Sequence, residues 1–107
     1  MTINEYQELA QQMASTTAPI TKIKNGILGL CKGTNKIADV YHESLYLKYD
    51  FDRDHMTEEL GDVCWYAAEL ATGLGVTLDE VMGRNIEKLH KRYPDGFDAE
   101  RSRHREE

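Results

Sequence analysis

The sequence predicts an all-α domain, a compact four-helix bundle. Apolar residues recur three and four positions apart along most of the chain, and no stretch shows the strict alternation that is typical of a half-buried strand. Two Thr-x-x-Glu signatures, at residues 2–5 and 77–80, mark helix starts. The length of 107 residues suits one small domain with a single core.

The first helix is expected over residues 3–14. Thr2 and Glu5 can form a capping box, in which a hydroxyl and a carboxylate each bind a free backbone N–H group. Apolar residues at helical spacing follow, and the polar run 15–18 with Pro19 ends the helix.

A second, longer helix is expected to begin near Thr21 or Lys22. Glycines at positions 26, 29 and 33 each weaken it by up to about 1 kcal/mol relative to alanine. Residues 50–54, with aspartate at every second position, are typical of a turn. The side chains expected to face inward are Ile23, Ile27, Leu30, Ile37, Val40 and Leu45.

A third helix is expected from about residue 54 to residue 74, ended by Gly73 and Gly75. The fourth follows Thr77 and ends before Pro94. Residues 1–98 are the expected helical domain, and the mixed charges of residues 99–107 predict a loosely ordered tail. Along the third helix an apolar seam is expected to face inward: Leu60, Val63, Ala67, Leu70 and Leu74.

The charge balance and the cysteines restrict the class of protein. A net charge of −6 argues against nucleic-acid binding, which needs clustered Lys and Arg. Cys31 and Cys64 lack CxxC spacing and are expected to be reduced, small core residues. Because no apolar leader or spanning stretch appears, a cytoplasmic location without membrane contact is expected.

Glu59 and Asp62 lie three positions apart, so a helix places both carboxylates on one face. Two anions held close together repel each other unless a cation joins them, and Mg²⁺ prefers carboxylate oxygens. The spacing therefore predicts two ligands of a metal site. The alternative is an ordinary solvated acidic helix edge.

The sequence around this pair, E-E-L-G-D-V-C-W-Y at residues 58–66, resembles the MazG-like family of all-α nucleoside triphosphate pyrophosphohydrolases. The resemblance continues through residues 85–89, 92–97 and 100–102, and it reaches back to 25–30 and 37–39. It implies a bundle of the all-α pyrophosphatase type that pairs into homodimers or tetramers, with the site near the subunit interface. Whether Tyr6, Trp65 and Tyr66 form that interface or fill the monomer core stays open.

The resemblance also implies a reaction. A nucleoside triphosphate is cleaved between its α- and β-phosphates, giving a monophosphate and pyrophosphate, with Mg²⁺ as cofactor. Glu59 and Asp62 match a catalytic pair of metal ligands in the family. Four further residues match positions of the pattern, where phosphate or base contacts and purely structural roles are both open: Asn85, Lys88, Arg92 and Tyr93.

One segment departs from the family pattern. Where the family has G-E-x-G-E, residues 32–36 are K-G-T-N-K, so Gly33 and Lys36 replace two metal-ligand glutamates. The four carboxylates of the family site become two carboxylates and one ammonium. Mg²⁺ is therefore expected to bind weakly or not at all, and the hydrolase activity to be weak or absent.

Lys36 is expected to face the same pocket as Glu59 and Asp62, which makes it a candidate substrate-binding residue. Its ammonium can pair with both carboxylates in place of a metal ion. It can instead lie in solvent, as most lysines do, or act as an amine nucleophile if it is desolvated.

Further departures gather on the second helix. They suggest a surface adapted to another use, by divergence or by engineering. The alternative function is therefore a catalytically silent binding module that uses residues 32–48. The departing residues are Tyr41, His42, Glu43, Leu47 and Lys48.

Overall fold

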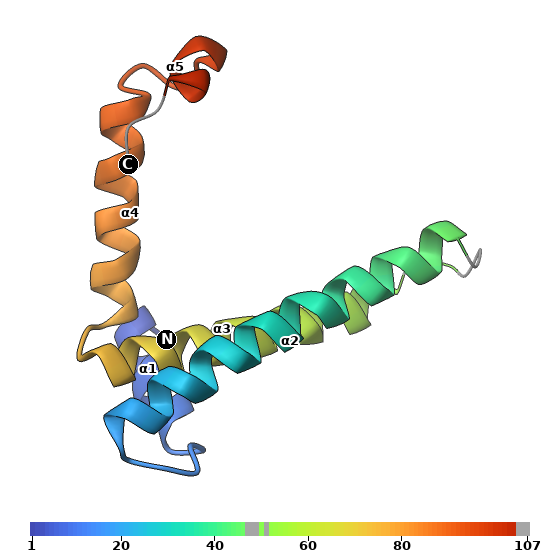
Figure 1. Cartoon of the computed structure of the whole chain (residues 1–107), viewed down its shortest axis with the longest axis vertical. Helices are drawn as coiled ribbons and strands as arrows, with labels where there is room; N and C mark the ends of the chain where they lie inside the picture. Colours follow the sequence, from blue (N-terminus) through green and yellow to red (C-terminus); the bar gives the residue numbers. More distant parts are fainter. Residues whose placement is uncertain (47–49, 51, 105–107) are drawn as a thin grey trace.

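The computed structural model describes residues 1–46, 50 and 52–104 (Figure 1). Within these residues there are five α-helices, four long and one short, and no β-strand apart from an isolated bridge between Pro94 and Gly96. The all-α prediction is confirmed. Leu47, Lys48 and part of the expected turn at 50–54 lie outside the described residues.

The first helix, α1 (Ile3–Gln11), starts at the expected capping box. Thr2 Oγ1 accepts from the Glu5 backbone N–H at 3.1 Å, and the Glu5 carboxylate accepts from the Thr2 N–H at 3.2 Å. The helix ends three residues earlier than expected. The N–H groups of residues 12–14 bond to carbonyls three residues back, which tightens the chain into a turn.

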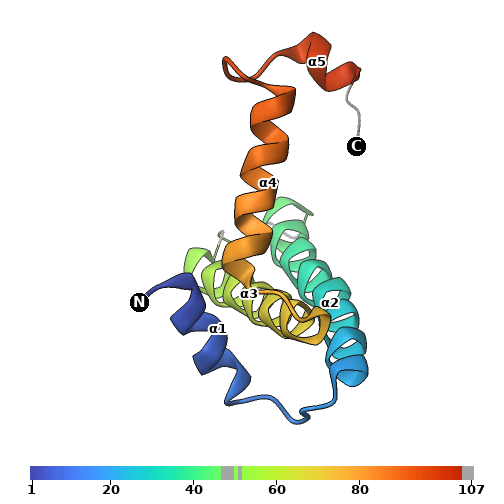
Figure 2. The ribbon, with the colours of Figure 1, turned by 90° about the vertical axis from the view of Figure 1, so that its left-hand side faces the viewer.

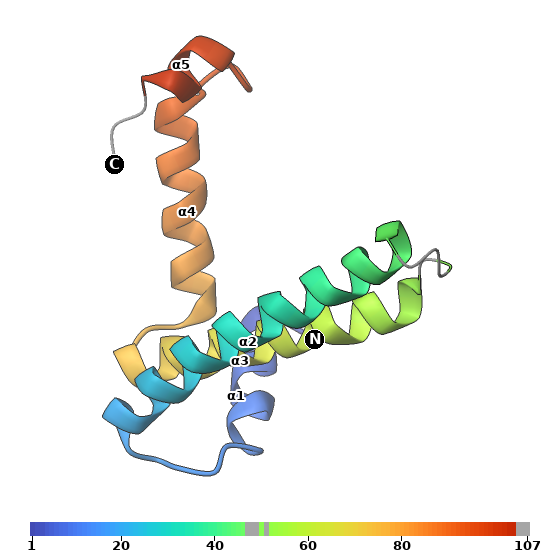
Figure 3. The same cartoon turned by 45° about the vertical axis from the view of Figure 1, so that its right-hand side comes forward.

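The helices α2 (Pro19–Tyr46) and α3 (Arg53–Leu74) run antiparallel, side by side (Figures 1 and 3). α2 begins at Pro19, slightly before the expected start, because proline lacks the N–H that the first helical turn leaves unpaired. Asp52 caps the start of α3 by accepting from the His55 N–H at 2.9 Å. Gly75, with φ of 76°, ends α3 in the left-handed conformation.

Glycines bring α2 and α3 close together. A Cβ atom at Gly26 would lie 2.6 Å from the Cβ of Leu70, and one at Gly29 would lie 2.0 Å from the Cδ1 of Tyr66. Gly73 was expected to end α3, but it lies inside the helix and packs against the start of α2. These glycines therefore do more than weaken helices, because only a hydrogen atom fits where they lie.

The start of α4 (Leu78–Arg92) is held by α1. Gln7 Oε1 accepts from the Leu78 N–H at 2.7 Å, and Gln7 Nε2 donates to the Val76 carbonyl at 3.1 Å. The second expected capping box is only half formed: Thr77 caps the Glu80 N–H, while the Glu80 carboxylate accepts from Arg84 at 2.8 Å. α4 ends before Pro94, as expected.

The core is small and lies where α1, α3 and the start of α4 meet. Its buried centre is made of three alanines and Leu78, with Tyr6 and Trp65 packed against it. Trp65 Nε1 also donates to the Ala10 carbonyl at 3.1 Å. Tyr6 and Trp65 therefore contribute to the core of the single chain.

Several aliphatic side chains that were expected to face inward are exposed in the single chain. Val40 is buried as expected. Leu70 and Val63 are half-buried and lie in the contact between α2 and α3, opposite Gly26 and Gly33. The exposed fractions are 47% for Ile27, 52% for Leu45, 54% for Leu60 and 58% for Leu74.

Both cysteines, Cys31 and Cys64, are free thiols as expected. The expectation that they are core residues is wrong, because both are exposed. Among the described helices, none combines the length and the apolar composition that crossing a bilayer requires.

α4 extends away from the other long helices (Figure 2). The radius of gyration is 16.8 Å, compared with about 13 Å for a compact chain of this length. The helices are consistent with a bundle, but the single chain is not compact. A short helix, α5 (Ala99–Arg103), follows within the segment assigned to the tail, and the domain boundary at residue 98 stays a prediction.

Candidate functional site

The pairing of α2 and α3 places the candidate metal-site positions at one level. Gly29 lies against Tyr66 and Gly33 against Val63. Because the helices are antiparallel, positions later in α2 lie level with positions earlier in α3. One turn beyond Gly33, position 36 is level with residues 59 and 60. The two positions where the resemblance expects glutamates therefore lie across from the segment that carries Glu59 and Asp62.

Glu59 has one carboxylate oxygen without a partner. Its Oε1 lies 3.2 Å from Nε2 of His55, one turn earlier on α3. Its Oε2 is buried and has no hydrogen-bond partner among the described residues, and only 15% of the side chain is exposed. Such an atom is costly to leave unpaired, so a proton, a water molecule or a cation would stabilise it.

Asp62 is exposed, and its carboxylate interacts electrostatically with the hydroxyl group of Tyr6 in α1. Burial raises the pKa of the Tyr6 hydroxyl above its ordinary value of 10.0, and electrostatic interactions with Cys64 and Asp62 raise this pKa further. Tyr6 therefore stays protonated at neutral pH and cannot serve as a base there.

Lys36 is exposed, and no ion pair within the part of the chain that the structure describes includes it. Of its three possible roles, the solvated lysine agrees with the structure. The pairing of its ammonium with Glu59 and Asp62 is not seen among these residues, and the role of Lys36 in the site stays a prediction. A long side chain at the surface gains little from an ion pair that water and lost side-chain entropy weaken.

The α4 candidates lie in a different place. Lys88 and Arg92 line a groove of about 470 Å³ where α4 and α5 meet. Asn85 is exposed, and the Tyr93 ring lies beside that of Phe97, with 5.5 Å between the ring centroids. Neither Glu59, Asp62 nor Lys36 lines this groove. One chain therefore does not bring the two sets of candidates into one pocket.

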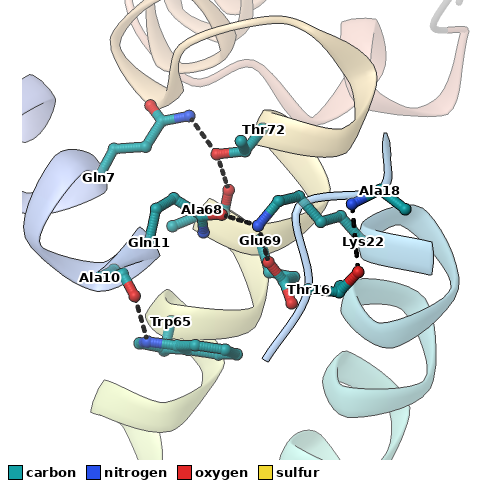
Figure 4. Close-up of polar contacts among 10 residues, drawn as sticks. All are labelled: Gln7, Ala10, Gln11, Thr16, Ala18, Lys22, Trp65, Ala68, Glu69 and Thr72. Carbon is teal, nitrogen blue, oxygen red and sulfur yellow. Dashed lines mark hydrogen bonds and ion pairs between the residues drawn. The ribbon is translucent and has the colours of Figure 1, made fainter. Parts of the chain in front are cut away.

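A buried ion pair joins α2 to α3, and no motif in the sequence indicated it (Figure 4). Lys22 Nζ lies 3.1 Å from Glu69 Oε1 and also donates to Gln11 Oε1 of α1. Lys22 is 7% exposed and Glu69 1% exposed. One signal could have revealed the pair: Lys22 lies one turn before Gly26, on the same face of α2.

Glu69 also lines a second pocket, of about 400 Å³, between α2 and α3. Trp65 and Tyr66 supply aromatic rings to it, and Asn25 and Lys32 supply polar groups.

Comparison with known proteins identifies the class. The family model for the MazG nucleotide pyrophosphohydrolase domain matches residues 1–97. Because this match covers most of the chain, the chain belongs to that family, as its sequence motifs predicted. It is 40% identical over 58 residues to the Gene 37 protein of Mycobacterium phage L5. That segment is 54% of this chain and 51% of the phage protein, so about half of the relative is matched. No solved structure matches the chain.

MazG proteins typically use Mg²⁺. Glu59 and Asp62 are suitable ligands, and the unpaired Oε2 of Glu59 is an atom that a cation would satisfy. Among the described residues, however, no group of three His, Cys, Asp or Glu side chains is placed to hold an ion.

Proposed function

We propose that this chain is a MazG-type nucleotide pyrophosphohydrolase domain whose Mg²⁺-dependent activity is weak or absent. The proposed substrate, if turnover remains, is a nucleoside triphosphate, split into a monophosphate and pyrophosphate. The observation that carries the proposal is the alignment of α2 with α3. It sets Gly33 and Lys36 level with Asp62 and Glu59, where the family pattern has glutamates.

The physical reason is the loss of oxygen ligands. Mg²⁺ requires near-octahedral oxygen coordination and gives up its water reluctantly. Glycine offers no side-chain donor, and a lysine ammonium repels the ion. A Mg²⁺-dependent pyrophosphate-release assay on a panel of nucleoside triphosphates tests the proposal. Robust turnover would contradict it and would mean that other groups, such as Asp39 or Glu43, supply the ligands.

The double substitution Gly33→Glu with Lys36→Glu is expected to restore metal binding. It places two carboxylates at i, i+3 spacing at the level of Glu59 and Asp62. Without metal, the crowded carboxylates should lower the melting temperature. Millimolar Mg²⁺ should then raise it by several degrees, since a ligand at 100 times its Kd stabilises by about 2.7 kcal/mol. Pyrophosphate release should appear with the metal.

The matched control is Gly33→Gln with Lys36→Gln. A Cβ at position 33 would lie 3.2 Å from Cγ2 of Val63, so any side chain there requires a small shift of that methyl group. The glutamine variant carries the same steric change and the same loss of lysine, but it adds no charge. Equal responses of both variants to Mg²⁺ would refute the proposal that positions 33 and 36 share a metal site with Glu59 and Asp62.

We also propose that the chain forms homodimers or larger homo-oligomers. Among the described long helices, α4 makes its main contacts with α1 and α3, and apolar side chains lie exposed along it. A chain of this size gains stability by covering such a surface. The exposed fractions are 43% for Val81, 47% for Met82 and 52% for Ile86.

Light scattering at micromolar concentration should therefore give a mass of at least twice 12.3 kDa. Ile86→Glu should shift the protein to monomer, because it places a charge in the proposed contact. Ile20→Glu is the control, since Ile20 is 80% exposed at the start of α2. A monomeric mass for the unchanged protein would contradict the proposal.

The second candidate function is an interaction module. The observation that favours it is the exposure of large side chains towards the end of α2: 55% for Tyr41, 52% for Leu45 and 70% for Tyr46. Exposed apolar and aromatic groups gathered in one region are typical of binding surfaces. If the variant Gly33→Glu with Lys36→Glu binds Mg²⁺ but hydrolyses no nucleoside triphosphate, an interaction module becomes the better interpretation of this chain.

A further inference from the structure

A histidine lies one turn before Glu59 on α3. His55 and Glu59 are four residues apart, so the helix places both side chains on the same face. Nε2 of His55 lies 3.2 Å from Oε1 of Glu59. The histidine side chain is 49% exposed and the glutamate side chain 15% exposed, so solutes reach the pair from the histidine side. An imidazole nitrogen and a carboxylate oxygen, two common metal ligands, are therefore held together near the surface.

The separation of these two atoms suits two ligands of one ion. Zinc binds an imidazole nitrogen at about 2.0–2.1 Å and a carboxylate oxygen at about 2.0–2.2 Å. With these bond lengths, two ligand atoms lie about 2.9 Å apart at a right angle and about 3.4 Å apart at the tetrahedral angle. The observed 3.2 Å between His55 and Glu59 lies between those values. A cation can therefore replace the contact between the two side chains without a large movement of either.

Glu59 also has an acceptor that the histidine does not satisfy. Its Oε2 is buried, and among the described residues no donor bonds to it. Leaving such an atom unpaired is unfavourable, because it has lost its contact with water. The contact with the imidazole involves only Oε1. A carboxylate that binds a cation through both oxygens satisfies Oε2 as well.

The nitrogen ligand decides the class of ion. Imidazole suits zinc, copper, nickel and iron, whereas magnesium prefers the oxygens of carboxylates, carbonyls and water. Asp62 lies one turn beyond Glu59 on the same face, where its charge attracts a cation without a direct bond. Lys36 repels a cation, but it is exposed, so its long side chain can turn towards solvent. Within the described ranges no three His, Cys, Asp or Glu side chains form a group, so water completes the coordination of a bound ion.

We propose that His55 and Glu59 hold one divalent transition-metal ion of the zinc, nickel or cobalt class. The ion joins Nε2 of the imidazole to the carboxylate. This site shares Glu59 with the candidate Mg²⁺ site, and the histidine ligand distinguishes it. The proposal rests on the contact between these two side chains and not on the proposed loss of hydrolase activity. Ion binding without nucleotide therefore tests it separately from pyrophosphate release.

Titration of the full chain, without an affinity tag, with Co²⁺ tests the proposal, first without and then with millimolar Mg²⁺. Calorimetry gives the number of ions and the affinity. NMR shows which imidazoles bind, because paramagnetic Co²⁺ shifts or broadens their signals. We expect one ion per chain, with His55 responding first among the four histidines. Mg²⁺ should change the affinity little, since a nitrogen ligand favours the transition metal.

His55→Gln should weaken Co²⁺ binding at least about tenfold, since even residues that only orient a metal ligand are worth about 10–100-fold in affinity. Glutamine keeps a hydrogen-bond donor for Glu59 but removes the imidazole. The matched control is His90→Gln, which removes an exposed histidine from the last turn of α4. It should bind Co²⁺ as the unchanged protein does, and circular dichroism would check that both variants keep their helices.

The absence of saturable Co²⁺ binding by the unchanged protein would overturn the proposal. So would equal weakening by His55→Gln and His90→Gln, because any surface histidine would then suffice. Cys31→Ser with Cys64→Ser removes two exposed thiols, which are also ligands for such ions. This variant should still bind one ion through His55, and loss of binding would assign the ion to the thiols instead. Displacement of Co²⁺ by millimolar Mg²⁺ would show a site made of oxygens alone and would contradict the histidine ligand.

Discussion

Glu69→Leu is expected to lower the free energy of unfolding by about 3–5 kcal/mol. The substitution leaves the Lys22 ammonium buried, at 7% exposure, without the carboxylate that now lies 3.1 Å away. Gln11 offers Lys22 an uncharged acceptor, which cannot replace the lost charge. Because small domains have only about 5–15 kcal/mol of stability, urea denaturation should show a large decrease in the midpoint.

Two further variants test whether the expected loss of stability comes from breaking a buried ion pair. Lys22→Met combined with Glu69→Leu removes both charges and should recover much of the loss, since apolar residues of similar size often replace a buried pair at little cost. Glu80→Leu breaks the exposed pair with Arg84 and should change stability by less than about 1 kcal/mol. If Glu69→Leu and Glu80→Leu have equally small effects, Lys22 is not buried against Glu69.

Gly26→Ala is expected to destabilise the protein by about 1–3 kcal/mol, although alanine is the better helix former. Its Cβ would lie 2.8 Å from the backbone nitrogen of Leu70, and a backbone cannot rotate aside as a side chain can. α2 and α3 would have to move apart, and this pair makes the most extensive contact between helices in the chain.

Gly61→Ala is the matched control inside α3. No atom lies within 4 Å of the Cβ that it adds, so it should stabilise the helix by about 0.5–1 kcal/mol. The two substitutions are chemically identical and are expected to act in opposite directions. A stabilising effect of Gly26→Ala, measured by the same urea denaturation, would show that the helices are not in close contact there.

The sequence determined where most helices begin and end, because those signals are local. The capping box of Thr2 and Glu5, the cap at Thr77 and the stop before Pro94 involve groups within a few residues of one another. The family was also readable from motifs. That Gly33 and Lys36 replace two metal-ligand glutamates stays a prediction. The roles of Glu59 and Asp62 in metal binding stay a prediction.

Only the tertiary structure decided which faces of the helices meet. The aliphatic pattern of α2 predicted that Ile27 and Leu45 face inward, but α3 packs on the face of Lys22, Gly26 and Gly29. Periodicity measures how apolar a face is and says nothing about how closely a neighbouring backbone approaches it.

The same limit applies to the charged sites. Lys22 and Glu69 are 47 residues apart in sequence, and Arg101 joins the α4 arginines only because the chain turns back after Tyr93. No local sequence pattern predicts either of these two contacts. The alignment of α2 with α3 sets Gly33 level with Asp62, and it arises from steric contact between the two helices. The sequence thus determined which chemical groups are present, and the packing of distant segments decided which of them lie together.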